Sequence, residues 1–152
     1  MERIYIDRDL CEACKNCVLA CMATKEDIEI AELNLSNLKN QSANLIAQPE
    51  NYEDNAPLFC RHCDEPDCVE ACMSGALSKD KKTGVVSVDQ DKCAGCWMCV
   101  MSCNYGLVFK DKDRNVAFKC DLCSKQDKPS CIEQCPTDAI KLIEVKDKQV
   151  IG

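Results

Sequence analysis

Sixteen cysteines in four groups of four constrain this chain more than any other feature of its sequence. The first and third groups share the spacing C-x2-C-x2-C-x3-C, and they are Cys11, Cys14, Cys17, Cys21 and Cys93, Cys96, Cys99, Cys103. The second and fourth groups both end in C-V/I-E-x-C, and they are Cys60, Cys63, Cys68, Cys72 and Cys120, Cys123, Cys131, Cys135. The two types of group alternate along the chain, which indicates an internal duplication. The four groups predict four metal sites with four ligands each.

The redox state of these cysteines follows from the compartment. Cysteine makes up more than a tenth of the 152 residues, a density typical of disulfide scaffolds and metal-cluster proteins. The first ten residues, MERIYIDRDL, carry charges throughout and lack the apolar stretch of a signal peptide. No apolar run approaches the roughly 20 residues that a membrane helix needs. We therefore expect a soluble, cytoplasmic chain with reduced, metal-binding cysteines, with export in a complex whose partner carries the signal as the alternative.

The charge of the chain limits its partners. A formal net charge of -7, from 26 acidic and 19 basic residues, argues against nucleic acid or an anionic membrane surface, which require a concentrated basic face. Residues 26–59 form an acidic insert in which one base, Lys39, stands against seven acids. These acids are Glu26, Asp27, Glu29, Glu32, Glu50, Glu53 and Asp54. Such a segment is either a solvated surface or a docking surface for a partner.

The compact C-x2-C-x2-C turn suits a cubane 4Fe-4S cluster, because three thiolates at that spacing can surround one corner of the cube. The next cysteine, three residues on, is expected to begin a helix that leads away from the cluster. In the bacterial ferredoxin pattern C-x2-C-x2-C-x3-C-P this fourth cysteine ligates the other cluster of a pair. Only Cys135 keeps the following proline, Pro136.

The segments between the groups indicate which groups form pairs. A strand, a Lys-Lys-Thr-Gly turn and a strand containing Val85, Val86 and Val88 predict a hairpin between groups two and three. Groups one and four are flanked by apolar strands around Ile4–Ile6 and residues 140–145, which can pair with each other. This arrangement predicts that Cys21 completes the cluster of group four. Sequential pairing, one with two and three with four, is the alternative, and it is weakened by residues 22–59, which lack glycine and a comparable hairpin.

The predicted fold class is therefore α+β, with two bacterial-ferredoxin-like halves, each with short β-hairpins and two iron–sulfur clusters. One half, residues 60–116, is inserted into the other, which comprises residues 1–25 and 117–152. The acidic insert and a hairpin over LVFKDKDRNVAFK connect the two halves.

With CRHCDEPDCVEAC as its second group and CDLC-x7-C-x3-CP as its fourth, the chain resembles the four-cluster iron–sulfur subunits of molybdopterin oxidoreductases and hydrogenases. Its short length and the segment CVEACMSGAL make it most similar to the iron–sulfur subunit of nickel carbon monoxide dehydrogenase. The resemblance implies the same exchange of fourth cysteines and four 4Fe-4S clusters. The implied ligand sets are Cys11, Cys14, Cys17, Cys135; Cys120, Cys123, Cys131, Cys21; Cys60, Cys63, Cys68, Cys103; and Cys93, Cys96, Cys99, Cys72.

The same resemblance implies a non-catalytic electron-transfer subunit. The expected donor is carbon monoxide dehydrogenase, facing the half built from groups one and four, and the expected acceptor is a flavoprotein NAD(P) reductase, a hydrogenase or a ferredoxin. An aldehyde, formate or hydrogen oxidoreductase is the alternative partner. The sequence has no G-x-G-x-x-G or phosphate-loop motif and no catalytic residue constellation besides the cysteines.

Other metal chemistries fit the spacing less well. Structural zinc sites favour two C-x2-C knuckles separated by a longer loop, so a structural zinc protein is a remote alternative. Disulfides need an oxidising compartment, and a radical enzyme would show C-x3-C-x2-C. His62 is expected to donate to a cluster sulfur or to meet a partner, and Trp97 is expected to cover a cluster.

Overall fold

The computed structural model describes residues 1–34, 42–46, 56–111 and 113–145. Its α-helices are α1 (Asn16–Glu26), α2 (Asp67–Glu70), α3 (Met98–Ser102) and α4 (Ser130–Glu133), and its 3₁₀ helices are η1 (Ile30–Glu32) and η2 (Gln90–Lys92). Its strands are β1 (Glu2–Ile6), β2 (Leu45–Ile46), β3 (Pro57–Leu58), β4 (Leu77–Lys79), β5 (Val86–Val88), β6 (Val108–Asp111), β7 (Val116–Lys119) and β8 (Ile140–Glu144). None of the helices in these residues is long and apolar enough to cross a membrane.

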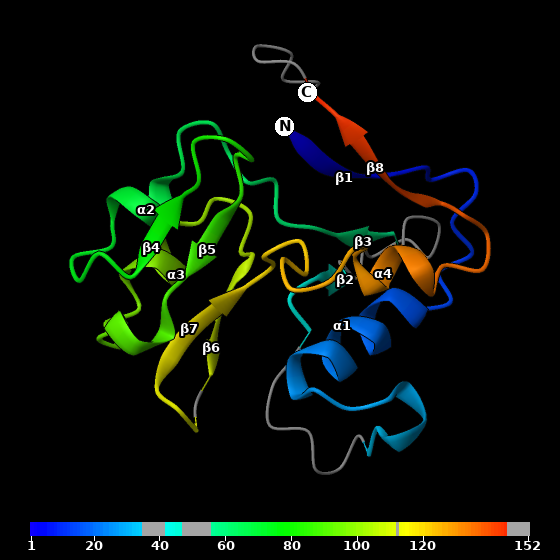
Figure 1. Ribbon diagram of the computed structural model, residues 1–152, viewed down its shortest axis with the longest axis horizontal. Helices are drawn as coiled ribbons and strands as arrows, with labels where there is room; N and C mark the ends of the chain where they lie inside the picture. The colour runs from blue at the N-terminus through cyan, green and yellow to red at the C-terminus, as the bar shows by residue number, and fades with distance from the viewer. Residues whose placement is uncertain (35–41, 47–55, 112, 146–152) are drawn as a thin grey trace.

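Strands from opposite ends of the described chain form the first sheet. β1 and β8 pair antiparallel, with Ile4 opposite Leu142 and Ile6 opposite Ile140 (Figure 1). Ile4 and Ile6 pack into an apolar cluster, whereas Tyr5 between them is 48% exposed, as the two-residue period of a strand requires. The predicted pairing of the two outer strands is confirmed.

Two hairpins lie in the middle of the sequence. β4 pairs with β5, and β6 pairs with β7, both antiparallel. Leu77 and Val86 are buried, whereas Ser78 and Ser87, which lie opposite each other, are exposed. The sequence predicts both hairpins, and both are confirmed. The insert contains a further short pair, β2 with β3, that the sequence does not indicate.

The elements gather into two groups (Figure 1). The helices α2 and α3 pack together beside the strands β4 to β7, and α1 packs on α4 beside β1 and β8. Each group has its own small apolar cluster. Leu77, Val86, Cys99, Val108 and Ala117 form one, and Cys17, Cys131, Ile132 and Ile140 form the other. Both clusters contain cysteine, so the thiol sites are part of the interior of the protein.

Candidate metal centres

The third cysteine of every group occupies the same place in a helix. Cys17, Cys68, Cys99 and Cys131 are each the second residue of their helix, α1 to α4. The expectation that the fourth cysteine begins the helix is therefore wrong. Pro66 and Pro129 immediately precede α2 and α4, and Lys15 and Trp97, with φ of 65° and 64°, precede α1 and α3. Each of these residues turns the chain from the loop into the helix just before the third thiol.

The residue before the second cysteine of every group has a left-handed backbone. The φ angles are 53° at Ala13, 46° at His62, 64° at Gly95 and 55° at Leu122. Residues other than glycine adopt this conformation only when the surrounding structure imposes it. Left-handed turns of this kind direct successive backbone N–H groups toward one concave side, which binds anions. The cysteine loops are thus shaped to surround a negatively charged group.

The structure gathers the thiols into four sites. Site 1 contains Cys11, Cys14, Cys17 and Cys135, which line a pocket that is partly open to solvent. Site 2 contains Cys21, Cys120, Cys123 and Cys131, which line a similar pocket. In site 3 the thiol of Cys68 lies within electrostatic range of Cys60, Cys63 and Cys103. In site 4 the thiol of Cys99 lies within electrostatic range of Cys72, Cys93 and Cys96. Groups one and four therefore exchange their fourth cysteines, and so do groups two and three.

Burial and mutual repulsion oppose ionisation of these thiols. Burial, followed by neighbouring thiolates, raises the pKa of Cys17 to about 11. Burial also raises the pKa of Cys120 to about 12, and that of Cys131 well above its usual range. Thiolates are nevertheless the form that binds metal. A polynuclear cation at each site would offset the repulsion, and the four convergent sulfurs per site fit a 4Fe-4S cluster.

Backbone N–H groups donate to the sulfurs of several fourth cysteines. Burial alone would raise the pKa values of Cys72 and Cys135. N–H donors in the loop after each cysteine, together with the hydroxyl of Ser74 for Cys72 and of Thr137 for Cys135, outweigh this effect and hold both pKa values below the usual range. The N–H of Leu107 donates to Cys103 Sγ over 3.4 Å. Hydrogen bonds to ligand sulfur are among the features that set the potential of an iron–sulfur site.

Part of the acidic insert builds sites 1 and 2, which sequence reasoning missed. The N–H of Ala43 donates to Cys21 Sγ over 3.3 Å, and Asn44 Nδ2 donates to the carbonyl of Cys17 over 3.2 Å. Pro57 lines site 1 and Phe59 lines site 2. No metal-ligand residue type marks these positions in the sequence. Of the seven acids, Glu50, Glu53 and Asp54 lie outside the described residues, as does Lys39.

The four sites follow one another in a row. Sites 1 and 2 share helix α1, and the thiols of Cys17 and Cys131 interact electrostatically. Sites 2 and 3 are neighbours because Cys60 acts on Cys120. Sites 3 and 4 are neighbours because two short segments each contribute to both sites. One segment carries Cys68 of site 3 and Cys72 of site 4, and the other carries Cys103 of site 3 and Cys99 of site 4. Only two of the sixteen cysteines are exposed, and they are Cys14 of site 1 and Cys96 of site 4, at opposite ends of the row.

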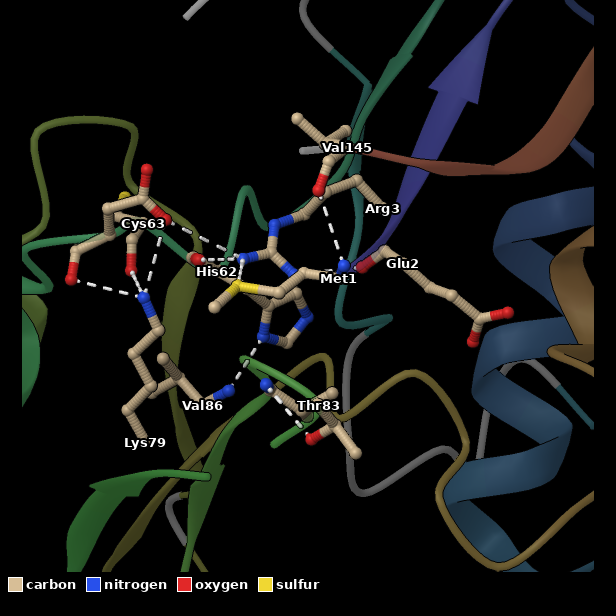
Figure 2. A network of polar contacts seen from close by, with 11 residues as sticks. Met1, Glu2, Arg3, His62, Cys63, Lys79, Thr83, Val86 and Val145 are labelled. Atoms are coloured by element: carbon tan, nitrogen blue, oxygen red, sulfur yellow. Dashed lines mark hydrogen bonds and ion pairs between the residues drawn. The ribbon is translucent and has the colours of Figure 1, made fainter. Parts of the chain in front are cut away.

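A polar network joins the two groups of elements beside site 3 (Figure 2). Arg3 Nη2, on β1, donates to the carbonyl of His62 over 2.9 Å, and Lys79 Nζ, on β4, donates to that of Cys63 over 2.9 Å. His62 Nδ1 accepts the N–H of Val86 over 2.9 Å. His62 is only 1% exposed, so it does not meet a partner at the surface, which is one of the two roles that its sequence position suggests.

Trp97 lies at the surface end of site 4. It immediately precedes helix α3 and is half-buried, and Lys110 Nζ lies 5.1 Å from its ring centroid. The indole is thus held in place by a cation–π contact. Its predicted role as a cover over the cluster stays a prediction.

The geometry also bears on the zinc alternative. A single zinc ion binds sulfur at about 2.3 Å, so its four thiolates would lie about 3.8 Å apart. Within the described part of the chain, which includes all sixteen cysteines, no three Cys, His, Asp or Glu side chains converge closely enough to hold one ion.

Comparison with known proteins gives consistent results. Residues 52–145 match the family described as the 4Fe-4S dicluster domain. The chain is 31% identical over 151 residues to the probable anaerobic dimethyl sulfoxide reductase chain YnfG of Escherichia coli strain K12, covering 94% of this chain and 73% of that protein. It is 32% identical over 165 residues to a sulfite dehydrogenase subunit of Allochromatium vinosum, covering 95% of this chain and 69% of that protein.

A solved structure shares the fold. The active site complex BamBC of benzoyl coenzyme A reductase in complex with zinc aligns with a TM-score of 0.53 and 22% identity. The alignment covers 97% of this chain and 82% of the other.

Proposed function

Because the chain belongs to the 4Fe-4S dicluster domain family, we propose that it carries four 4Fe-4S clusters and relays electrons between two partner proteins. Its relatives are electron-transfer subunits and not catalytic subunits. Sites 1 to 4 each hold one cluster, with the sixteen cysteines as iron ligands. The two element groups act as two ferredoxin-like halves, one inserted into the other, in the cytoplasm.

The row of four thiol sites is the observation that carries this proposal. Adjacent sites share a helix or an electrostatic contact, and the exposed thiols, Cys14 and Cys96, lie in the two end sites. A row with an accessible end at each side suits a protein that accepts electrons from one partner and passes them to another. A catalytic site would need a substrate pocket with acid, base or nucleophile groups besides the cysteines.

The protein's own residues hold the row and adjust it. A bound cluster accepts and returns one electron. The helices fix the spacing of the thiols, and the N–H donors of Ala43, Leu107 and Ala117 reach the sulfurs of Cys21, Cys103 and Cys93 over 3.3–3.4 Å. These donors stabilise added negative charge at their sulfurs, so they raise the potential of the site that they serve.

Resemblance favours carbon monoxide dehydrogenase as the donor, facing site 1. The acceptor is then a flavoprotein NAD(P) reductase, a hydrogenase or a ferredoxin at site 4. The relatives named above are chains of two other oxidoreductases, a probable dimethyl sulfoxide reductase and a sulfite dehydrogenase. By the family resemblance, an aldehyde, formate or hydrogen oxidoreductase is the second candidate for the catalytic partner.

A reconstituted electron-transfer assay tests the proposal. The anaerobically purified protein is mixed with carbon monoxide dehydrogenase and a flavin-dependent NAD(P) reductase, and CO-dependent reduction of the nicotinamide is followed. Parallel reactions contain formate dehydrogenase with formate, or hydrogenase with hydrogen. We expect the chain to accelerate one of these reactions, and Cys96→Ser, which alters an exposed end, to slow it more than Lys141→Met on the exposed face of β8. Equal rates with and without the chain in every reaction would contradict the relay function.

A further inference from the structure

Lys119 is a buried cation at the end of a strand. It ends strand β7 and is 3% exposed. Its ammonium donates to the carbonyl of Val86 over 2.6 Å and to that of Cys120 over 2.8 Å. Among the described residues, no acidic side chain forms an ion pair with it. Two carbonyl dipoles only partly replace the water that a buried ammonium loses, so a further source of negative charge is needed.

The neighbouring side chains do not supply that charge. Arg3 and Lys79 share the carboxylate of Asp64, at 3.9 and 3.4 Å, and Asp64 is 60% exposed. His62 is a neutral imidazole, because its Nδ1 accepts the N–H of Val86 over 2.9 Å and so carries no proton. Its proton is on Nε2, which has no hydrogen-bond partner among the described residues. The surroundings of Lys119 are therefore neutral or positive.

Lys119 lies between two of the thiol sites. It directly precedes Cys120 of site 2 and bonds to the carbonyl of that cysteine. It also lies within electrostatic range of the Cys68 thiol of site 3. Cys60 of site 3 and Cys120 of site 2 are themselves within electrostatic range. The ammonium thus stands at the junction of sites 2 and 3, the two inner sites of the row.

We propose that Lys119 is the internal counter-charge of the two inner clusters and raises their reduction potentials. The inference rests on the proposed function, because the negative charge that it requires is that of a cluster with four thiolates, about -2 when oxidised. Reduction adds one more negative charge, and a fixed cation in a poorly screened interior stabilises the reduced form more than the oxidised form. Lys119 is a positioning residue for charge and does not ligate iron.

Four variants test this role. Lys119→Met and Lys119→Gln remove the charge, Lys119→Arg keeps it, and Lys141→Met removes an exposed lysine from β8 as the matched control. Iron and sulfide content is measured first, and redox titration followed by electron paramagnetic resonance then gives the potentials. In both neutral variants we expect two of the four reduction potentials to fall. At a fixed potential, the ratio of reduced to oxidised cluster should be at least ten-fold lower, which corresponds to a shift of about 59 mV for one electron. Lys119→Arg and Lys141→Met should match the unaltered protein.

Each outcome decides the matter. Neutral variants with four clusters and unchanged potentials overturn the proposal, and so does an equal shift in Lys141→Met, which would reflect only total charge. If the neutral variants fail to retain iron while Lys119→Arg retains it, the positive charge is required and the proposal stands. If Lys119→Arg loses iron as well, the lysine serves packing and the proposal is wrong. An unaltered protein that holds no iron would instead overturn the proposed function, and this inference with it.

Discussion

Cys17 and Cys21 lie one turn apart on helix α1, yet their thiols belong to different sites. Cys17 lines site 1 with Cys135, and Cys21 lines site 2 with Cys131. One helix therefore fixes the relative position of two adjacent sites, because a shift of α1 would move a ligand of each.

Replacing Cys21 should damage a site that is remote in sequence. Cys21→Ser removes one thiol from site 2, while Cys11, Cys14, Cys17 and Cys135 keep site 1 complete. We expect the loss or conversion of one cluster, up to about four iron atoms per chain, and the resonance signal of the other three to persist. Cys14→Ser is the control, since it should perturb site 1 instead. If both variants altered the same cluster, the exchange of fourth cysteines would be wrong.

Metal analysis should distinguish iron–sulfur clusters from zinc. Four complete thiol sets predict about sixteen iron and sixteen acid-labile sulfide per chain after anaerobic purification or reconstitution. The measurement is elemental analysis combined with a sulfide assay. A stoichiometric zinc content without sulfide, or saturation near twelve iron, would disprove the four-cluster assignment.

Gly95 should tolerate a methyl group less well than Gly75. Both have a left-handed backbone, with φ of 64° and 67°. A Cβ on Gly95 would come within 2.5 Å of the carbonyl oxygen of Asn115, whereas one on Gly75 would meet nothing within 4 Å. We expect Gly75→Ala to cost about 1–2 kcal/mol through backbone strain, and Gly95→Ala a further ~1–3 kcal/mol through the clash.

The measurement is the denaturant midpoint for loss of visible absorbance in the two variants. Gly95→Ala should in addition loosen site 4, because Gly95 lies between Cys93 and Cys96. Ala13 occupies the corresponding position of the first group with φ of 53°, which shows that space and not conformation alone decides the difference. Equal midpoints for the two variants would refute this explanation.

Asp111 should contribute stability that acid removes. The side chain is 1% exposed and accepts the N–H groups of Asp113 and Arg114, both over 3.1 Å, and Arg114 Nε over 2.7 Å. Although burial raises the pKa of Asp111, these donors lower it below its usual range. The carboxylate therefore stabilises the fold above the unfolded pKa of about 3.9, and this contribution disappears as the pH falls through the lower pKa of the folded state.

The corresponding variant is Asp111→Asn, which places an amide donor against Arg114. We expect its free energy of unfolding at pH 7 to be about 1–3 kcal/mol lower than that of the unaltered protein, with the difference shrinking below about pH 4. Denaturant unfolding of both proteins at pH 7, 5 and 3 tests this, since any general acid sensitivity affects both alike. A difference that stays constant with pH would show that the carboxylate charge has no part.

The strand pairs could be read from the sequence because they depend on regular spacing, whereas the four ligand sets are implied by the resemblance of the cysteine groups to a known family. Apolar residues such as Ile4, Ile6, Val86 and Val88 mark strands by their alternation, and the cysteine spacing marks ligands by chemistry. Pro66 and Pro129 could also have located the starts of α2 and α4, since proline commonly stands near that position.

Other features of the sites depend on tertiary contacts and carry no local signal. Ala43 reaches Cys21 through its backbone N–H, which any residue except proline possesses. The left-handed conformation at Ala13 and Leu122 is imposed by the cysteine loops, since neither residue type favours it. The burial of Lys119 is equally invisible in a sequence where lysine usually marks the surface.

The pairing of β1 with β8 has a consequence for biosynthesis. Cys135 and β8 leave the ribosome long after Cys11, Cys14 and Cys17, whereas sites 3 and 4 use only cysteines between Cys60 and Cys103. Sites 3 and 4 can thus be completed while site 1 still lacks its fourth thiol, Cys135. Iron incorporation into stalled nascent chains of increasing length should therefore proceed from the middle outward.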